Sequence, residues 1–576
     1  MGRPIRVLFG TETGNAEGCA EELLEGVQAL GLTAELTDMD DYDRDEIAEE
    51  EYVFIVTSTF GNGDAPYNAE QFLDFLKGPD APDVSSLRFA VCGLGDRSYP
   101  NFAQCGKDFD ARLDALGGTR VVPRMDCDVD FEVPFDQWKR QVLGWLAENH
   151  PEAGDAPAPA ARPEKKGGFW GKVSGWFGGK KAEDVVSAPT SPTSTPAPAT
   201  SAPAEKPTWT RDNPFMSKVV ARRLLSGEGS AKETMHYELD LTGSGIEFHG
   251  GDSFGVFPHN PPAEVAGILE GLGLDPEAAV TLKDGSTRAL RSVLTRVKDL
   301  QRVPVDLLRA LADAGGPGAD ALAAGGEATA AYLKERYVLD VVRDHPDAAL
   351  DAQRLTDLLR ALPPRLYSVA NSPKIDADRV HFVVETLRYE RQGRPCEGVA
   401  SVWFADRVGD EPVPLYLQPN TAFRLPAPDV DIIMVGPGTG IAPFRAFLQE
   451  RQVAGGSGRS WLFFGHQHQA TDHLYSNELQ AYAASGVLAR QSYAWSRDQD
   501  DKIYVQDRIR EEGAEVWKWL QGGAHVFVCG DAHGMAPGVH EALHQVAITH
   551  GGMDRDGAEA FVQGLVDDKR YHRDVY

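Results

Sequence analysis

The sequence predicts a multidomain α/β protein in which two doubly wound units flank a β-rich unit. Strand-like and helix-like segments alternate at both ends of the 576-residue chain, a pattern typical of parallel sheets covered by helices. A Pro/Ala/Ser/Thr-rich stretch at 151–207 interrupts the alternation, and β-rich sequence follows it. A chain of this length exceeds what one hydrophobic core supports, so we expect several domains.

The first unit, residues 1–150, is predicted to be a doubly wound parallel sheet. Four short apolar runs each precede a helix-like stretch, as expected when strands and helices alternate. The apolar runs are 5–10, 52–59, 88–94 and 120–125, and the helices are expected to begin near Ala16, Asn68, Asn101 and Val133.

Residues 151–207 are predicted to be a linker, because their composition cannot bury a core. Within it, the segment 165–181 places aromatic residues among five lysines. Its role stays open between a weak membrane-surface or partner-binding helix and plain linker, since its glycines oppose helix formation.

The second unit, 208–427, is predicted to be an antiparallel barrel with a helical insert at about 262–360. Its strand-like segments are KVVARRLL, HYELDLTG, RLYSVA, HFVVETL and GVASVWFA. The third unit, 428–576, returns to alternating strands and helices and is expected to be a second doubly wound sheet.

Composition excludes several classes of function. A net charge of −30 argues against nucleic-acid binding. No stretch reaches the roughly 18 apolar residues of a membrane span, and residues 1–10 do not resemble a secretory signal, so the sequence predicts a cytoplasmic protein. The six cysteines are scattered without metal-ligand spacing, so no metal site is expected.

Three loops at the carboxyl ends of strands in the first unit form a candidate FMN site. The first combines hydroxyls and a glycine at a helix start, where backbone N–H groups bind phosphate, and lacks the lysine of triphosphate loops. The other two carry glycines and one aromatic residue each, Phe60 and Tyr99, for stacking on a flat ring. The candidate residues are Thr11, Glu12, Thr13, Gly14, Asn15, Ala16, Ser58, Thr59, Phe60, Gly61, Leu94, Gly95, Asp96, Arg97, Ser98, Tyr99, Asn101 and Phe102.

These loops resemble the flavodoxin-like domain of the diflavin reductase family. In the second unit, RLYS and GVAS are similar to the FAD signature of ferredoxin reductases. The resemblance implies that Arg365 pairs with the FAD pyrophosphate, that Tyr367 stacks on the flavin ring, and that Ser368 bonds near its reactive nitrogen. The implied FAD residues are Arg365, Leu366, Tyr367, Ser368, Tyr389, Gly398, Val399, Ala400 and Ser401.

The third unit carries a loop, GPGTGIAP, between an apolar strand and a helix, as a pyrophosphate site requires. It is not the G-x-G-x-x-G fingerprint. Cations near the adenosine ribose favour NADPH over NADH, and a second segment resembles the 2′-phosphate pocket of the family, so NADPH is predicted. The candidate residues are Gly436, Gly438, Thr439, Gly440, Ser496, Arg497, Lys502, Tyr504 and Gln506.

The same resemblance implies a hydride-transfer group near the C-terminus, made of Ser368, Cys529 and Asp574. Tyr576 would cover the FAD ring and move aside for nicotinamide. A buried strand cysteine is ordinarily inert, so the role of Cys529 rests on the resemblance.

Within the family, segments such as AWSRDQ, AHVFVCGDA and KRYHRDVY are most similar to the flavoproteins of assimilatory NADPH-sulfite reductase. The similarity implies that electrons pass from NADPH through FAD and FMN to a separate haemoprotein, a siroheme sulfite reductase subunit. The first unit is acidic, with runs such as Asp38 to Asp45, and two interpretations of this charge stay open: a docking face for the haemoprotein and a well-solvated surface. Two alternatives stay open: a reductase of another haemoprotein, such as a cytochrome monooxygenase, and a redox-inactive scaffold.

Overall fold

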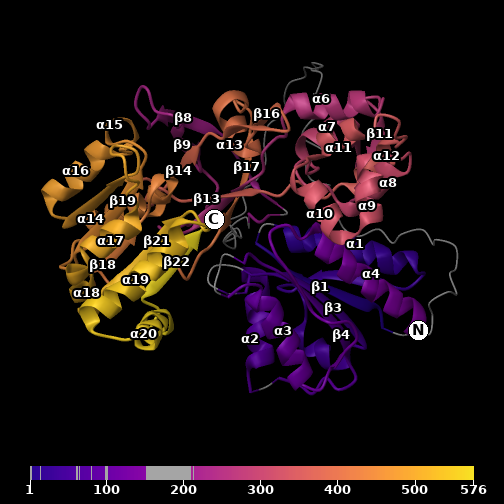
Figure 1. The fold of residues 1–576 in the computed structure, drawn as a ribbon, viewed down its shortest axis with the longest axis horizontal. Coiled ribbons are helices and arrows are strands. Elements are labelled where there is room, and N and C mark those ends of the chain that lie inside the picture. The colour runs from indigo at the N-terminus through magenta and orange to yellow at the C-terminus, as the bar shows by residue number, and fades with distance from the viewer. Residues whose placement is uncertain are drawn as a thin grey trace, which may run out of the picture.

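The computed structural model describes residues 3–12, 14–59, 63, 65–79, 81–97, 101–150, 209–211 and 213–576. The predicted linker, including 165–181, lies outside the described residues. Figure 1 shows the first unit (indigo to purple) beside the helical insert of the second unit, with the third unit (orange to yellow) across a central junction. The C-terminus lies at this junction.

The first unit is a parallel sheet in the order β2-β1-β3-β4-β5, with β6 also paired to β4. This confirms the predicted doubly wound sheet. The order reverses between β1 and β3, where open α/β sheets bind ligands. The strands are β1 (Ile5–Gly10), β2 (Ala34–Asp38), β3 (Tyr52–Ser58), β4 (Arg88–Leu94), β5 (Thr119–Arg120) and β6 (Met125–Cys127), and the helices are α1 (Asn15–Ala29), η1 (Arg44–Glu49), α2 (Tyr67–Lys77), α3 (Gln104–Ala115) and α4 (Glu132–Asn149).

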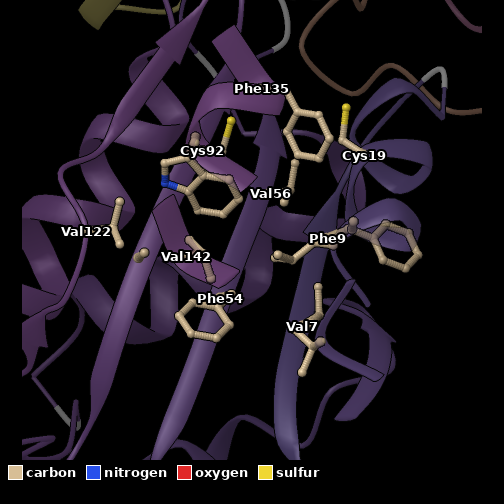
Figure 2. Close-up of a cluster of buried hydrophobic side chains, with 14 of the residues drawn as sticks. Val7, Phe9, Cys19, Phe54, Val56, Cys92, Val122, Phe135 and Val142 are labelled. Carbon is tan, nitrogen blue, oxygen red and sulfur yellow. The ribbon is translucent and has the colours of Figure 1, made fainter. Parts of the chain in front are cut away.

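Figure 2 shows the core between this sheet and helices α1 and α4. Phe54 and Val56 of β3 face Val142 of α4 in this layer. Their neighbours on the strand, Val53 and Ile55, face the opposite layer under α2 and α3, because successive strand residues point to opposite sides. Both faces of the sheet are therefore buried, as an apolar strand predicts.

The single strand predicted at 120–125 is wrong, because the structure divides this region into β5 and β6. Pro123 lies between the two strands. A proline has no N–H to donate to the ladder, so pairing is interrupted there.

The second unit contains two antiparallel sheets, β13-β10-β17-β7 and β14-β9-β8, that share one hydrophobic core. Phe254 of the first sheet and Phe382 of the second lie with ring centroids 6.2 Å apart. The antiparallel prediction is confirmed, but the described strands do not close into a barrel. The strands are β7 (Phe215–Ser217), β8 (Val219–Leu224), β9 (Thr234–Asp240), β10 (Ser253–Val256), β13 (Arg365–Ser368), β14 (Arg379–Glu385) and β17 (Val413–Gln418), beside the hairpin β15 (Arg388–Arg391) and β16 (Arg394–Glu397).

The segment GVASVWFA, predicted as a strand, is helical. It forms α13 (Val399–Val402) and a π-helical turn, η2 (Trp403–Arg407). Val399, Val402 and Phe404 are all buried. A short apolar run buried on every side has no periodicity that separates a strand from a helix, so the sequence alone misassigned it.

Helices occupy the predicted insert and pack around their own apolar core. They are α6 (Pro262–Gly271), α7 (Leu290–Arg296), α8 (Val305–Ala312), α9 (Pro317–Ala324), α10 (Gly326–Lys334), α11 (Val338–Asp344) and α12 (Ala352–Leu358), with a hairpin of β11 (Ala279–Thr281) and β12 (Thr287–Ala289). The insert lies against α1 and α4 of the first unit (Figure 1).

The third unit is a parallel sheet in the order β20-β19-β18-β21-β22, with apolar clusters on both faces. The strands are β18 (Ile432–Val435), β19 (Ser460–His466), β20 (Arg490–Trp495), β21 (His525–Gly530) and β22 (Tyr571–Val575), and the helices are η3 (Gly438–Ile441), α14 (Ala442–Ala454), α15 (Gln469–Asp472), α16 (Ser476–Ser485), α17 (Val505–Glu511), α18 (Gly513–Gln521), α19 (Met535–Gly551) and α20 (Arg555–Asp567). Across the described part of the chain, no helix has the length and apolar character of a membrane span.

Candidate functional site

One cavity of about 1110 Å³ lies between the three units. It exceeds the roughly 300–1,000 Å³ of a typical single ligand pocket, so it has room for more than one ligand. Residues predicted from the sequence in all three units line it. They are Glu12, Asn15, Ser58, Thr59, Leu94, Gly95, Asp96, Asn101 and Phe102 of the first unit, Arg365–Ser368 and Gly398–Ser401 of the second, and Thr439 and Tyr576 of the third.

The first loop of the first unit connects β1 to α1. Gly14 takes a left-handed conformation (φ 90°) at the helix N-cap, and its N–H donates to Oγ1 of Thr11 at 2.9 Å. The N–H of Thr11 donates to Oδ1 of Asn68 at 2.8 Å. These bonds shape the loop around the start of the helix, where a phosphate is favoured.

Five predicted residues of the FMN site lie outside the described residues: Thr13, Phe60, Gly61, Ser98 and Tyr99. The two predicted stacking aromatics are among them. Of the remaining set, Ala16 is buried in the first turn of α1, and the guanidinium of Arg97 lies over the ring of Phe102 at 4.9 Å.

The FAD signature lies at the edge of the first antiparallel sheet, on β13. The ring of Tyr367 stacks on Phe382 at 5.4 Å. The guanidinium of Arg365 donates to the carbonyl of Pro363 at 2.9 Å and to Gln301 at 3.4 Å. The side chains of β13 thus line the cavity from a sheet that holds them rigidly, with a permanent cation at one end.

The glycine-rich loop of the third unit packs tightly on the end of β21. A Cβ at Gly440 would lie 2.8 Å from the carbonyl carbon of Cys529. Only glycine allows this approach, because a methyl group would collide with backbone that cannot move aside. The loop therefore brings Gly436–Gly440 beside the strand that carries Cys529.

Ser368 lines the cavity, and Cys529 and Asp574 lie buried behind it. The parallel pairing of β21 with β22 sets Cys529 opposite Asp574. The hydroxyl of Ser368 donates to Oδ2 of Asp574 at 2.7 Å, and Sγ of Cys529 lies 3.7 Å from the same oxygen. Residues from two units thus converge on one carboxylate.

Burial dominates the electrostatics of this cluster. Asp574 is 8% exposed, and burial raises the pKa of its carboxyl although Ser368 and Cys529 donate to it. Burial and the nearby carboxylate raise the pKa of Cys529 well above its usual value. The thiol is therefore protonated at neutral pH and donates to Asp574 rather than acting as a nucleophile.

Tyr576, the last residue, lines the cavity and is 61% exposed. Its hydroxyl lies 2.9 Å from Oγ1 of Thr439, and its N–H donates to the carbonyl of Gly530 at 3.0 Å. Because most of the side chain is exposed, its ring can rotate once the contact with Thr439 is broken.

The predicted 2′-phosphate residues lie outside the cavity lining, where α17 packs against the end of β20. Arg497, Lys502 and Tyr504 are exposed. Within the described ranges, neither Arg497 nor Lys502 forms an ion pair, and Oε1 of Gln506 is buried without a hydrogen-bond partner. Unpaired cations fit the phosphate of a ligand at this position, and the carbonyl oxygen of Gln506 could accept from a ligand hydroxyl.

Three family models match the chain: Flavodoxin over residues 7–138, FAD binding domain over 207–313 and 327–403, and Oxidoreductase NAD-binding domain over 434–541. The sulfite reductase [NADPH] flavoprotein alpha-component of Bacillus subtilis (strain 168) is 40% identical over 583 residues, which cover 100% of this chain and 90% of the relative. Those of Mannheimia succiniciproducens and Vibrio cholerae are 39% and 38% identical, over 99% of this chain and 90% and 87% of the relatives.

The chain belongs to the family of sulfite reductase [NADPH] flavoprotein alpha-components. This confirms the family that the C-terminal segments predicted. The Flavodoxin family model matches residues 7–138, which include nearly the whole sheet of the first unit. The family assignment therefore extends to the first unit.

The cavity of this flavoprotein includes side chains that the sequence did not single out. Tyr337 and Arg302 from the insert line it, together with Arg391 from the β15–β16 hairpin. The guanidinium of Arg391 lies 4.3 Å from the ring centre of Tyr337. No sequence motif surrounds these three residues, so the sequence carried no signal that they line the cavity. Predicted Tyr389 is not in the lining, and its hydroxyl lies 2.6 Å from that of Tyr337.

Helix α1 presents acidic side chains to the second unit. Glu17, Glu21 and Glu25 are four residues apart, so they lie along one face of the helix. Glu17 pairs with Arg211, and Lys283 pairs with Glu21 at 2.8 Å and Glu25 at 3.0 Å. Part of the acidic surface of the first unit is thus matched by cations of the same chain.

Helix α4 adds a second set of contacts to this face. The guanidinium of Arg309 in the insert donates to both carboxylate oxygens of Asp136, at 2.9 and 2.6 Å. Glu22 accepts from Arg360 at 2.7 Å and from Lys139 at 3.1 Å. Planar, bidentate and largely buried pairs hold a defined geometry, so the first unit docks on the insert in one orientation.

One group in the described part of the chain has metal-ligand chemistry: His236, Glu238 and His381, whose ligand atoms lie within 4.8 Å of one another. Arg379 donates to Glu238 at 2.6 Å, and Arg445 lies 3.4 Å from Nδ1 of His381. Two guanidinium groups repel a metal cation, so these contacts belong to the packing of the second unit on the third.

Proposed function

We propose that the chain passes electrons from NADPH through FAD and then FMN to a separate haemoprotein, the sulfite-reducing subunit of an assimilatory sulfite reductase. The single observation that carries this is the shared cavity, which is lined by the FMN loops, by the FAD signature and by Ser368 of the hydride-transfer cluster. When bound, the two flavins supply the conversion of a two-electron hydride into single electrons.

The protein groups have separate roles in this proposal. Arg365 would neutralise the FAD pyrophosphate, and Tyr367 would support the flavin ring from β13. Asp574, oriented by Ser368 and Cys529, would supply a negative charge beside the bound nicotinamide during hydride transfer. Tyr576 would cover the flavin site in the absence of nicotinamide. Residues 1–150, 208–427 and 428–576 would be the FMN, FAD and NADPH domains, joined across 151–207.

The named relatives are alpha-components, which supports a separate partner subunit. We place its docking surface on the acidic first unit. Because Arg309, Arg360 and Lys283 occupy part of that surface, the partner and the insert compete for it, and the first unit must leave the insert before it delivers electrons.

Replacing Arg309 with alanine is expected to lower the docking equilibrium constant of the first unit about tenfold or more, as loss of a buried charged pair does. Small-angle scattering at low salt should show a larger radius of gyration, and FAD-to-FMN transfer should slow. The matched control is Arg140→Ala, because Arg140 binds the same Asp136 at 2.8 Å from within the first unit. Equal effects of both variants would contradict the docking role of Arg309.

The function itself is tested by mixing the purified chain, loaded with FMN and FAD, with NADPH and the cognate siroheme subunit. Sulfite-dependent NADPH oxidation is the expected result. Reduction of cytochrome c without sulfite reduction would instead support the reductase of another haemoprotein, and a chain that binds neither flavin would support the scaffold alternative.

A further inference from the structure

A short segment at the start of the second unit carries Arg211 to the first unit. The indole N–H of Trp209 donates to the carbonyl of Ser244 at 2.7 Å, and its ring packs edge-on against Phe215. The backbone groups of Thr210 and Asn213 bond to each other in both directions. Arg211 therefore projects from a turn that is anchored on the second unit.

The guanidinium of Arg211 reaches the loop between β1 and α1. It pairs with Glu17, and it lies so close to Gly14 that a Cβ there would be 2.9 Å from its Cζ. Beside it, Nε2 of Gln418, at the end of β17, donates to Glu12 of the same loop at 2.5 Å. Two rigidly held side chains of the second unit thus contact one loop of the first.

This loop has no cation of its own. Residues 7–43 contain no Lys or Arg, and Glu12 and Glu17 flank the start of α1. A phosphate monoester carries a charge of about −1.5 to −2 at neutral pH, so two carboxylates at this position oppose its binding. Helix N-terminal N–H groups attract an anion, but they do not cancel two nearby negative charges.

We propose that Arg211 is an FMN-phosphate ligand that the second unit supplies to the first; this rests on the proposed function, in which that loop binds FMN. Arg211 neutralises part of the phosphate charge and offsets Glu17. Because the cation arrives only when the units dock, FMN binding and docking strengthen each other by the same factor. FMN is therefore held most tightly when the first unit is docked on the second.

The test measures dissociation constants of FMN and riboflavin for the full chain, loaded with FAD, by quenching of flavin fluorescence. Arg211→Ala is expected to weaken FMN binding about tenfold or more, the usual effect of losing a hydrogen bond to a charged group. Riboflavin, which lacks the phosphate, should bind within about twofold of the wild type. Arg211→Lys should restore part of the loss, since lysine keeps the charge without the planar fork.

Glu17→Ala separates this role from that of a simple interface ion pair. If Arg211 only pairs with Glu17, both alanine variants weaken FMN binding alike. If Arg211 serves the phosphate, Glu17→Ala leaves FMN binding unchanged or tighter. Loss of affinity in Glu17→Ala, an unchanged FMN constant in Arg211→Ala, or equal losses for both flavins would each overturn the inference. A wild-type chain that binds no FMN would instead refute the proposed function.

Discussion

Replacing Asp574 with asparagine is expected to slow the reduction of bound FAD by NADPH about a hundredfold, the usual effect of removing one preorganised electrostatic group from a reacting centre. Asparagine has the same shape and still accepts the hydrogen bond from Ser368, so the lower rate of FAD reduction would result from removal of the negative charge. Stopped-flow absorbance of FAD after mixing with NADPH measures this step directly.

The pH dependence of the same step follows from burial. Because burial raises the pKa of Asp574, hydride transfer in the wild type should fall as pH drops toward that raised value, where the carboxylate gains a proton. Asp574→Asn should lack this limb of the profile. An identical limb in the variant would assign it to another group.

The pH dependence of folding stability should be opposite to that of the hydride-transfer rate: stability should fall as pH rises. The folded state holds the Asp574 proton more tightly than the unfolded state does, so this group favours folding below its unfolded pKa of about 3.9, and the benefit is lost as pH rises through the folded pKa. Above that folded pKa the buried charge opposes folding. Asp574→Asn should therefore unfold at an equal or higher temperature, which separates a slow enzyme from a misfolded one.

The matched control is Asp567→Asn, the same exchange at an exposed position of α20 outside the cavity. It should leave the rate of FAD reduction unchanged. Equal rates of FAD reduction in wild type and Asp574→Asn would exclude the proposed role of this carboxylate.

Replacing both Arg497 and Lys502 with alanine is expected to lower the preference for NADPH over NADH about a hundredfold. Each substitution removes one charge-assisted contact with the 2′-phosphate, and each such contact contributes about tenfold in affinity. KM for NADPH should rise while kcat and the constants for NADH stay near wild type, because the contact is the same in the ground and transition states. Steady-state kinetics with both nucleotides measure the ratio.

Lys518→Ala is the control for this pair, because Lys518 is an exposed cation of the same unit that pairs only weakly with Glu515, at 3.8 Å. Its nucleotide preference should equal that of the wild type. An unchanged preference in the double variant would show that other groups recognise the 2′-phosphate.

Much of the architecture was predictable because its signals are local. Apolar runs followed by glycine-rich loops and amphipathic helices predicted both parallel sheets, and the carboxyl ends of parallel strands necessarily share one edge. For this reason the loops at Gly14 and Gly95 could be assigned to one site without knowing the strand order. The order β2-β1-β3-β4-β5 then followed from packing.

Where local signals were ambiguous, the predictions from the sequence were wrong. The largely apolar run Val399–Phe404 is buried on every side, so its sequence has no periodicity that separates a strand from a helix. The second unit alternates as a barrel does, but whether its sheet closes depends on strand tilt and stagger across the whole unit, which no single strand encodes.

By itself, the sequence determined the three units, the loops that open into the cavity and the family, because each depends on residues close together in the chain. Only the tertiary structure decided which distant groups meet. Ser368 reaches Asp574 across 206 residues, and Arg211 reaches Glu17 from the start of the second unit. A serine or an arginine has many acceptable partners in such a chain, and only packing of the units selects one.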